Sequence, residues 1–182
     1  MIEIHRNGAK PMIHFVLGGA RSGKSAFAET LALSKRQPSG RLIYVATAQI
    51  FDDEMRDRIS LHQDRRGPEW ELCEAPIDLG AALAEHDAAD NVLLVDCLSV
   101  WTTNLLIGEH DIPTIRDALC TQLESLQSTI IFVASETGLG IVPDNALSRR
   151  FRDESGLVNQ SVAAIANEVF FVTAGIATKI KP

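Results

Sequence analysis

The sequence lacks the features of several common protein classes. It has no excess of basic residues, since 17 Lys and Arg stand against 24 Asp and Glu, for a formal net charge of -7. Proteins that bind nucleic acid usually carry a basic face that neutralises phosphates. The composition therefore argues against a nucleic-acid partner. A small phosphorylated ligand remains compatible, because it needs positive charge only locally.

Long apolar runs and cysteine motifs are also missing. No stretch of 18 apolar residues occurs, and the start, MIEIHRNGAKP, has no apolar core of secretory length. We therefore expect a cytoplasmic protein without a membrane anchor. The three cysteines, Cys73, Cys97 and Cys120, form no Cys-x-x-Cys pair, and we interpret them as reduced and structural. Aromatic residues make up only 5% of the chain, which leaves few side chains to stack on a ligand.

What the chain does contain is a regular alternation of two patterns. Its 182 residues, 46% of them hydrophobic, predict one domain spanning 1–182, in which residues 1–11 form an N-terminal extension. Short runs rich in Val and Ile predict strands over 12–17, 41–46, 92–95, 129–134 and 169–173, with a weaker one over 70–75. Helical stretches between them cover 24–34, 52–65, 78–85, 113–127 and 153–167. This alternation predicts a mostly parallel sheet covered by helices, with ligands at the carboxyl ends of the strands.

A phosphate-binding motif follows the first predicted strand. The pattern G-x-x-x-x-G-K-[ST] is matched by Gly18, Gly19, Ala20, Arg21, Ser22, Gly23, Lys24 and Ser25. Glycines let backbone N–H groups turn around an anion, and the helix that starts here adds partial positive charge. We expect Lys24 to reach the β- and γ-phosphates and Ser25 to ligate Mg²⁺. Together with the alternation of strands and helices, the motif leads us to expect an α/β fold class. This is a P-loop-type three-layer fold with a mostly parallel central sheet, and we expect one antiparallel edge strand in it.

Asp96 is a candidate for the second half of this site. It ends the apolar run VLLV, and a carboxylate at that strand end is well placed to ligate Mg²⁺. The alternative is an ordinary strand that ends in a helix cap. No Asn-Lys-x-Asp element is present, which argues against a regulatory GTPase that reads guanine through that element.

The segment IFDDEMRDRISLHQDRR predicts a helix that turns His62 inward. At about 100° per residue, His62 shares a face with Phe51, Met55 and Ile59, and two arginines flank it. His62 can be a core histidine. However, guanidinium groups on a buried face need anionic partners, which a nucleotide would supply, and a neutral imidazole is a competent nucleophile toward phosphorus. The residues themselves thus indicate a nucleotide-dependent transferase and leave a covalent histidine open.

Several segments together resemble one family in chain order, from about Ile13 to Lys181. They are GGARSGKS, YVATAQIFDDEMRDRI, H-x-x-R-R at 62–66, DCLSVWTTNLL, SETGLGIVP and FRDESGLVNQSVA. The family is the bifunctional adenosylcobinamide kinase and adenosylcobinamide-phosphate guanylyltransferase of cobalamin biosynthesis. The resemblance implies that ATP or GTP, with Mg²⁺, phosphorylates adenosylcobinamide. It further implies that His62 takes GMP from GTP and passes it to the cobinamide phosphate, giving adenosylcobinamide-GDP.

The same resemblance implies further site residues and an assembly. Nucleotide binding would involve the loop of residues 18–25 together with Ala46, Thr47, Ala48, Gln63, Asp64, Arg65, Arg66, Glu74 and Asp96. Each of the additional positions has a structural alternative, such as a plain strand end or a solvated helix face. A homotrimer with sites near subunit interfaces is also implied. Two other functions stay open: a small-molecule kinase without nucleotidyl transfer, and a nucleotide-binding regulatory module without catalysis.

Overall fold

One sheet runs through the computed structural model, which describes residues 11–48 and 67–182. Its strand order over this part of the chain is β3-β2-β4-β5-β1-β6-β7. The strands are β1 (Met12–Gly18), β2 (Leu42–Ala46), β3 (Trp70–Glu74), β4 (Val92–Asp96), β5 (Thr129–Ser135), β6 (Glu168–Thr173) and β7 (Ile176–Lys181). All neighbouring pairs are parallel except β6 and β7, which are antiparallel. The predicted mostly parallel sheet with one antiparallel edge strand is confirmed.

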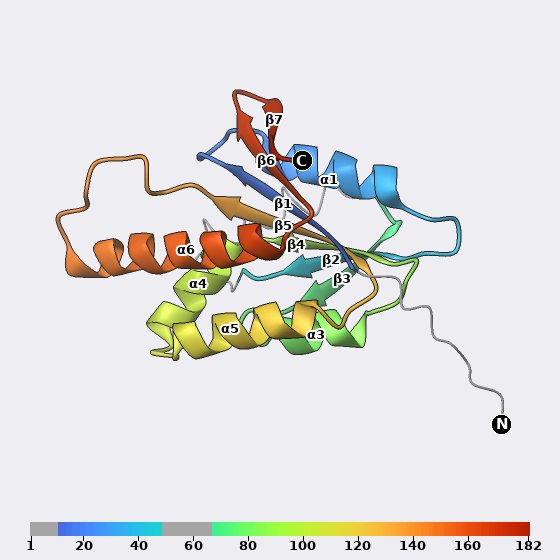
Figure 1. Cartoon of the computed structure of the whole chain (residues 1–182), viewed down its shortest axis with the longest axis horizontal. Coiled ribbons are helices and arrows are strands. Elements are labelled where there is room, and N and C mark those ends of the chain that lie inside the picture. Colours follow the sequence, from blue (N-terminus) through green and yellow to red (C-terminus); the bar gives the residue numbers. More distant parts are fainter. Residues whose placement is uncertain (1–10, 49–66) are drawn as a thin grey trace.

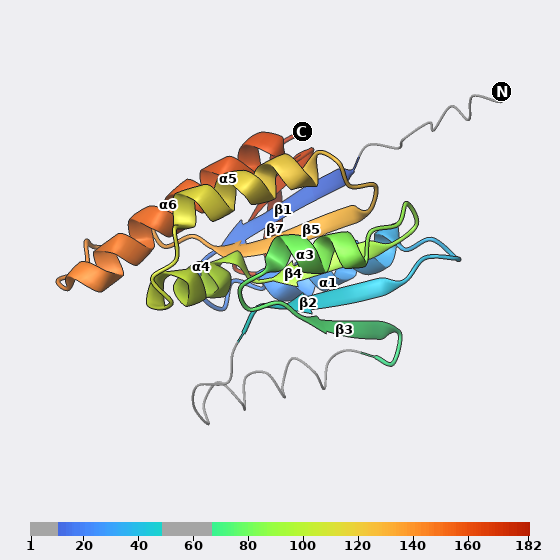
Figure 2. The ribbon, with the colours of Figure 1, turned by 90° about the horizontal axis from the view of Figure 1, so that it is seen from below.

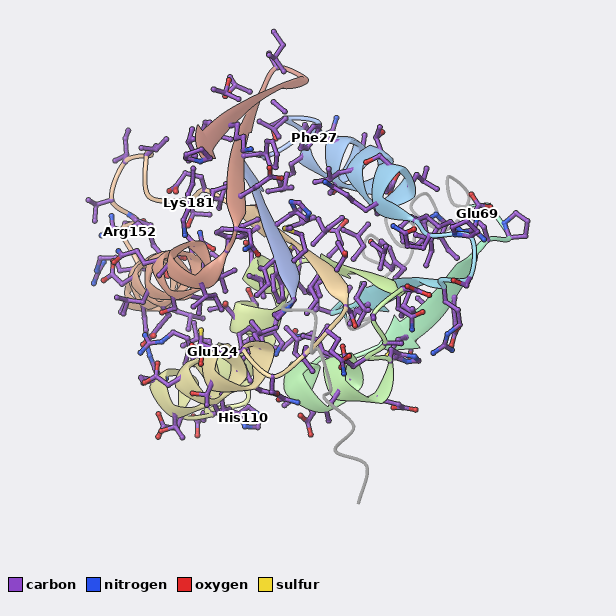
Figure 3. The ribbon with its side chains drawn as sticks, turned by 45° about the vertical axis from the view of Figure 1, so that its right-hand side comes forward. Phe27, Glu69, His110, Glu124, Arg152 and Lys181 are labelled. Atoms are coloured by element: carbon purple, nitrogen blue, oxygen red, sulfur yellow. The ribbon has the colours of Figure 1, made fainter. Side chains whose placement is uncertain are left out.

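Helices cover both faces of the sheet, as the predicted three-layer arrangement requires (Figures 1 and 2). One face carries α1 (Lys24–Lys35), and the other carries α3 (Leu79–Glu85), α4 (Leu98–Ile107), α5 (Ile112–Leu123) and α6 (Ala146–Ile165). Figure 3 shows the same division, with the labelled Phe27 on the α1 side, where its ring lies 5.1 Å from the ring of Phe170. Two separate apolar clusters fill the spaces between the sheet and these two helical layers.

The central strands are apolar without alternation, apart from the buried His14 of β1, because both of their faces are covered. Residues 13–18 of β1 and the first four residues of β4 are all buried, as expected of parallel strands between two helical layers. Side chains cap three of the helices: Asp78, Asp111 and Asn145 each accept a hydrogen bond from a backbone N–H three residues on. Within the described ranges, no helix is long and apolar enough to cross a membrane.

The six predicted strands and the helices α1, α3 and α5 occur within a few residues of their expected bounds. The predicted start of α6 at residue 153 is wrong, because Asn145 caps the helix and α6 begins at Ala146. Helix α4 and strand β7 were not predicted as elements. The predicted helix over 52–65 and residues 1–10 of the expected N-terminal extension lie outside the described residues.

Candidate active site

The phosphate loop follows β1 directly, and two of its positions require glycine, one for lack of room and one for its backbone conformation. A Cβ at Gly18 would lie 2.5 Å from Ser22 Oγ and 2.6 Å from the carbonyl oxygen of Val172. Gly23 caps α1 with a φ of 94°, in the left-handed region that other residues disfavour. These requirements fold residues 18–25 into a tight turn whose last two residues open α1, which is an anion-binding arrangement.

The turn between β6 and β7 supports this loop. The N–H of Gly175 donates to the carbonyl oxygen of Ser22 over 2.8 Å. A Cβ at Gly23 would lie 3.2 Å from Gly175 Cα. Ser22 is buried, and within the described part of the chain its hydroxyl has no hydrogen-bond partner. The loop is therefore held on one side, while Ala20 and Arg21 are exposed.

Lys24 begins α1 and its ammonium group lies back over the loop. Its Nζ donates to the carbonyl oxygen of Gly19 at 3.1 Å. The charge of Lys24 also acts on the thiol of Cys97, the residue that follows β4, which indicates that the lysine lies near the end of that strand. Burial, with a contribution from the charge of Asp96, raises the pKa of Cys97 to about 11, and Lys24 opposes that rise. The cation of the phosphate loop thus lies close to the carboxyl end of β4.

Three predicted nucleotide-binding positions lie side by side across the sheet. Ala46 of β2 pairs with Glu74 of β3 on one side and with Asp96 of β4 on the other. Neighbouring strands are about 4.8 Å apart, so the backbones of Glu74 and Asp96 lie about 10 Å apart. Because the strands are parallel, this row lies at the carboxyl ends of the strands, which is the side of the sheet where the phosphate loop also lies. Asp96 is two strands from β1, whereas Glu74 is four strands from it, about 19 Å across the sheet. The structure therefore places the loop, Ala46, Glu74 and Asp96 at the same end of the strands, with Asp96 nearer to the loop than Glu74.

Asp96 is held in place by Tyr44. The Tyr44 hydroxyl donates to Asp96 Oδ2 over 3.1 Å. Tyr44 packs in the apolar cluster on the α1 side of the sheet, and Asp96 faces the same side because alternate residues of a strand share a face. The carboxylate is thus directed to the side of the sheet where the phosphate loop opens α1.

Ser25 and Asp96 fit the ligands that Mg²⁺ takes beside a bound nucleotide. Both are half-buried near the carboxyl ends of the strands. Ser25 lies in the first turn of α1, and Asp96 lies at the end of β4. No three His, Cys, Asp or Glu side chains of the described residues gather into a metal-binding group. Mg²⁺ does not need one, since it keeps several waters and binds one or two carboxylates together with phosphate oxygens.

Thr47 directs its polar groups into the protein. It is fully buried, and its hydroxyl donates to the carbonyl oxygen of Cys97 and accepts from the Cys97 N–H, both over 2.8 Å. Its carbonyl oxygen accepts from Asn104 Nδ2 at 2.7 Å. The side chain of Thr47 therefore fixes the strand end, and the half-buried Ala48 is the next residue along the chain.

The predicted nucleophile and its neighbours lie outside the described residues. These are His62, Gln63, Asp64, Arg65 and Arg66, within the range 49–66. Their places in the site remain predictions.

Two residues of this region were not singled out from the sequence, although each had a signal. Tyr44 is the one tyrosine of the chain and stands in an otherwise aliphatic strand, where a buried hydroxyl needs a partner. Asn104 stands in the apolar run of α4, where a buried amide needs hydrogen bonds. Both side chains bond to the segments that carry the predicted nucleotide contacts.

Comparisons with known proteins agree with this geometry. The family model for CobU, described as cobinamide kinase / cobinamide phosphate guanyltransferase, matches residues 14–180. The bifunctional adenosylcobalamin biosynthesis protein CobP of Pseudomonas aeruginosa is 44% identical over 173 residues, covering 93% of this chain and 98% of the relative. The bifunctional adenosylcobalamin biosynthesis proteins CobU of Salmonella typhimurium and Escherichia coli are 39% and 38% identical, each over 93% of this chain and 100% of its own length.

The family model spans nearly every described element, from β1 to β7, and the relatives match over almost their whole length. The resemblance drawn from the sequence motifs is thereby confirmed. This chain belongs to the CobU family of cobinamide kinases and cobinamide phosphate guanyltransferases.

Proposed function

We propose that this chain catalyses two consecutive transfers to one corrinoid substrate. It first phosphorylates adenosylcobinamide with a nucleoside triphosphate. It then transfers GMP from GTP to the cobinamide phosphate, giving adenosylcobinamide-GDP. The observation that carries the proposal is the phosphate loop at the head of α1 in a chain that the family model matches over residues 14–180.

In the kinase step, a substrate hydroxyl attacks the γ-phosphorus of ATP or GTP and loses its proton. The bond from that phosphorus to the bridging oxygen breaks, and nucleoside diphosphate leaves. The backbone N–H groups of residues 18–25 hold the phosphates, and Lys24 exchanges the carbonyl oxygen of Gly19 for phosphate oxygens. Ser25 and Asp96 would hold Mg²⁺, which neutralises phosphate charge when it is bound.

In the second step, a ring nitrogen of His62 attacks the α-phosphorus of GTP. Pyrophosphate leaves, and GMP is held on the imidazole through a P–N bond. A phosphate oxygen of the cobinamide phosphate then attacks the same phosphorus, the P–N bond breaks, and free His62 is restored. We assign the nucleotide contacts to residues 46–48, 63–66, Glu74 and Asp96.

The proposed setting is a cytoplasmic homotrimer without nucleic acid or a membrane anchor. The loop between β5 and α6 (Figure 1) supports self-association, because Leu139, Ile141 and Val142 are 82%, 97% and 59% exposed there. Exposed apolar side chains gathered in this way commonly mark protein interfaces. Sedimentation equilibrium tests the assembly: a trimer gives three times the 19.8 kDa chain mass, and a monomer mass contradicts it.

Labelled GTP tests the proposed intermediate. GTP carrying the label on its α-phosphate is expected to form an acid-labile, base-stable adduct with the wild-type protein and none with His62→Ala. His110→Ala is the matched control, since His110 lies between α4 and α5 (Figure 3). An adduct that persists in His62→Ala shows that His62 is not the nucleophile. Phosphorylation of adenosylcobinamide without any adduct indicates a kinase alone, and GTP binding without either reaction indicates a regulatory module.

A further inference from the structure

Asn104 of α4 joins two of the segments that carry predicted nucleotide contacts. Its Nδ2 donates to the carbonyl oxygen of Thr47 over 2.7 Å and to that of Pro76 over 2.9 Å. Thr47 follows the last residue of β2, and Pro76 lies two residues beyond the end of β3. Asn104 is 4% exposed, so little water reaches these hydrogen bonds. One amide group thus fixes two chain segments at the point where they leave the sheet.

Thr47 extends this connection to a third segment. Its hydroxyl bonds to both the N–H and the carbonyl oxygen of Cys97, the residue that follows Asp96. Sheet hydrogen bonds fix Ala46, Glu74 and Asp96 up to their strand ends. Beyond those ends, Asn104 and Thr47 hold the path of the backbone. The path of the chain beyond β2 and β3, and with it the position of Ala48, therefore depends on the amide of Asn104.

The chemistry at this position requires an amide. Both neighbours of Nδ2 are carbonyl oxygens, which only accept hydrogen bonds, so the side chain must present two N–H donors to them. A carboxylate of the same shape would place an oxygen against two carbonyl oxygens, and all three would lack donors. Aspartate at residue 104 thus has nearly the shape of asparagine, but its carboxylate would be repelled by the two carbonyl oxygens.

We propose that Asn104 is a positioning residue for nucleotide binding, which fixes the segments that follow β2 and β3 at the end of the sheet where the phosphate loop also lies. This inference rests on the proposed function, because it requires that the chain binds GTP at the carboxyl ends of the strands. It assigns to Asn104 no contact with nucleotide or substrate. Its effect passes through the backbone of residues 46–48 and 74–76.

The test compares Asn104→Asp with Thr102→Val in the full-length protein. Thr102 lies on the same helix, is fully buried, and donates only to the carbonyl oxygen of Leu98 within that helix. Thr102→Val thus removes a buried hydrogen bond of α4 without touching the strand ends. Calorimetry measures the Kd for GTP with Mg²⁺, kinase assays give kcat and KM for GTP, and urea unfolding gives the stability of each variant.

Asn104→Asp is expected to raise the Kd and KM for GTP by about tenfold or more, the scale of a lost supporting hydrogen bond. Its kcat at saturating GTP should change less, and Thr102→Val should keep the wild-type Kd. If Asn104→Asp does not fold, Asn104→Ser carries the test, because its smaller side chain leaves room for a water to reach the two carbonyl groups.

Two results overturn the inference. One is a Kd for GTP within twofold of wild type in an Asn104 variant that unfolds at lower urea, since this shows a role in stability alone. The other is an equal rise in Kd for Thr102→Val. A wild-type protein that binds no GTP overturns the proposed function first, and the inference with it.

Discussion

The hydroxyl of Tyr44 donates a 3.1 Å hydrogen bond to Oδ2 of Asp96, which connects the middle of β2 to the last residue of β4. The tyrosine is 4% exposed, and its ring makes a T-shaped contact with the ring of Trp70 at a centroid distance of 6.2 Å. This hydrogen bond sets the direction of the one strand-end carboxylate that the proposal assigns to Mg²⁺.

Tyr44→Phe should weaken Mg²⁺ binding without disturbing the fold. The ring and its packing stay, and the hydrogen bond to Asp96 is lost. We expect the Mg²⁺ concentration for half-maximal kinase activity to rise about tenfold, with kcat at saturating Mg²⁺ near wild type. Trp70→Phe is the control, because it alters the ring contact and leaves the hydroxyl in place. An unchanged Mg²⁺ dependence in Tyr44→Phe would show that Asp96 does not act as proposed.

Lys24→Ala should abolish most of the kinase activity. The ammonium group lies at the loop, 3.1 Å from the carbonyl oxygen of Gly19, and is expected to stabilise charge on the transferring phosphate. The expected loss in kcat/KM corresponds to about 3 kcal/mol or more, the scale of one electrostatic catalytic group. Lys35→Ala, at the other end of α1, is the matched control. A loss of less than tenfold for Lys24→Ala contradicts the assigned position of the lysine.

Gly18→Ala should destabilise the protein more than Gly19→Ala. A Cβ at Gly18 meets Ser22 Oγ and the Val172 carbonyl oxygen at 2.6 Å or less, whereas a Cβ at Gly19 meets nothing within 4 Å. Because the Val172 contact is backbone, the loop itself must shift. We expect Gly18→Ala to lower the free energy of unfolding by about 1–3 kcal/mol. Urea denaturation without nucleotide measures this, and equal stabilities for the two variants would contradict it.

His14 should make the stability of the protein depend on pH. It is fully buried, and its Nδ1 lies 2.8 Å from Glu168 Oε2. Burial and the charge of Lys35 lower the pKa of His14 below 6.5, against the opposing effect of Glu168. The unfolded chain then binds the proton more readily than the folded one. The free energy of unfolding is therefore highest above pH 6.5 and falls as the pH drops below it.

Urea denaturation on both sides of pH 6.5 measures this effect, with His14→Gln as the variant that cannot titrate. The wild-type protein should lose more stability than His14→Gln as the pH falls. The pKa of Glu168 is lowered from 4.5, chiefly by its hydrogen bond from Lys179, so that carboxylate does not titrate near pH 6.5. Parallel pH profiles for the two proteins would show that His14 is not the group responsible.

The fold was predictable where its elements carry simple patterns. The buried strands are short apolar runs, and the phosphate loop marks the junction of β1 and α1. Helix α4 was not predicted because it is buried around most of its circumference. Apolar residues such as Leu98, Trp101 and Leu105 therefore do not alternate with a polar face in the way that reveals an amphipathic helix. Strand β7 was not predicted because it is a short, mostly exposed edge strand in which polar and apolar residues are mixed. A tight turn through Ala174 and Gly175, both at positive φ, connects it to β6.

The candidate site was predictable in part for a related reason. Motifs indicate residues that are expected to meet the ligand, such as Lys24 and Asp96. They do not identify the residues that hold those groups, because support is a matter of distance in the folded chain. Tyr44 is 52 residues from Asp96, and Asn104 is 57 residues from Thr47. For Thr47 itself, the family resemblance implies a nucleotide contact, whereas the structure places its hydroxyl on Cys97.

The hydrogen bond from Gly175 to Ser22 makes the phosphate loop depend on a part of the chain that is distant in sequence. The two residues stand 153 positions apart, and contacts between residues so far apart are slow to form because the intervening chain must first be ordered. The glycine-rich loop is therefore braced only after β6 has paired with β1 and the hairpin of β6 and β7 has formed.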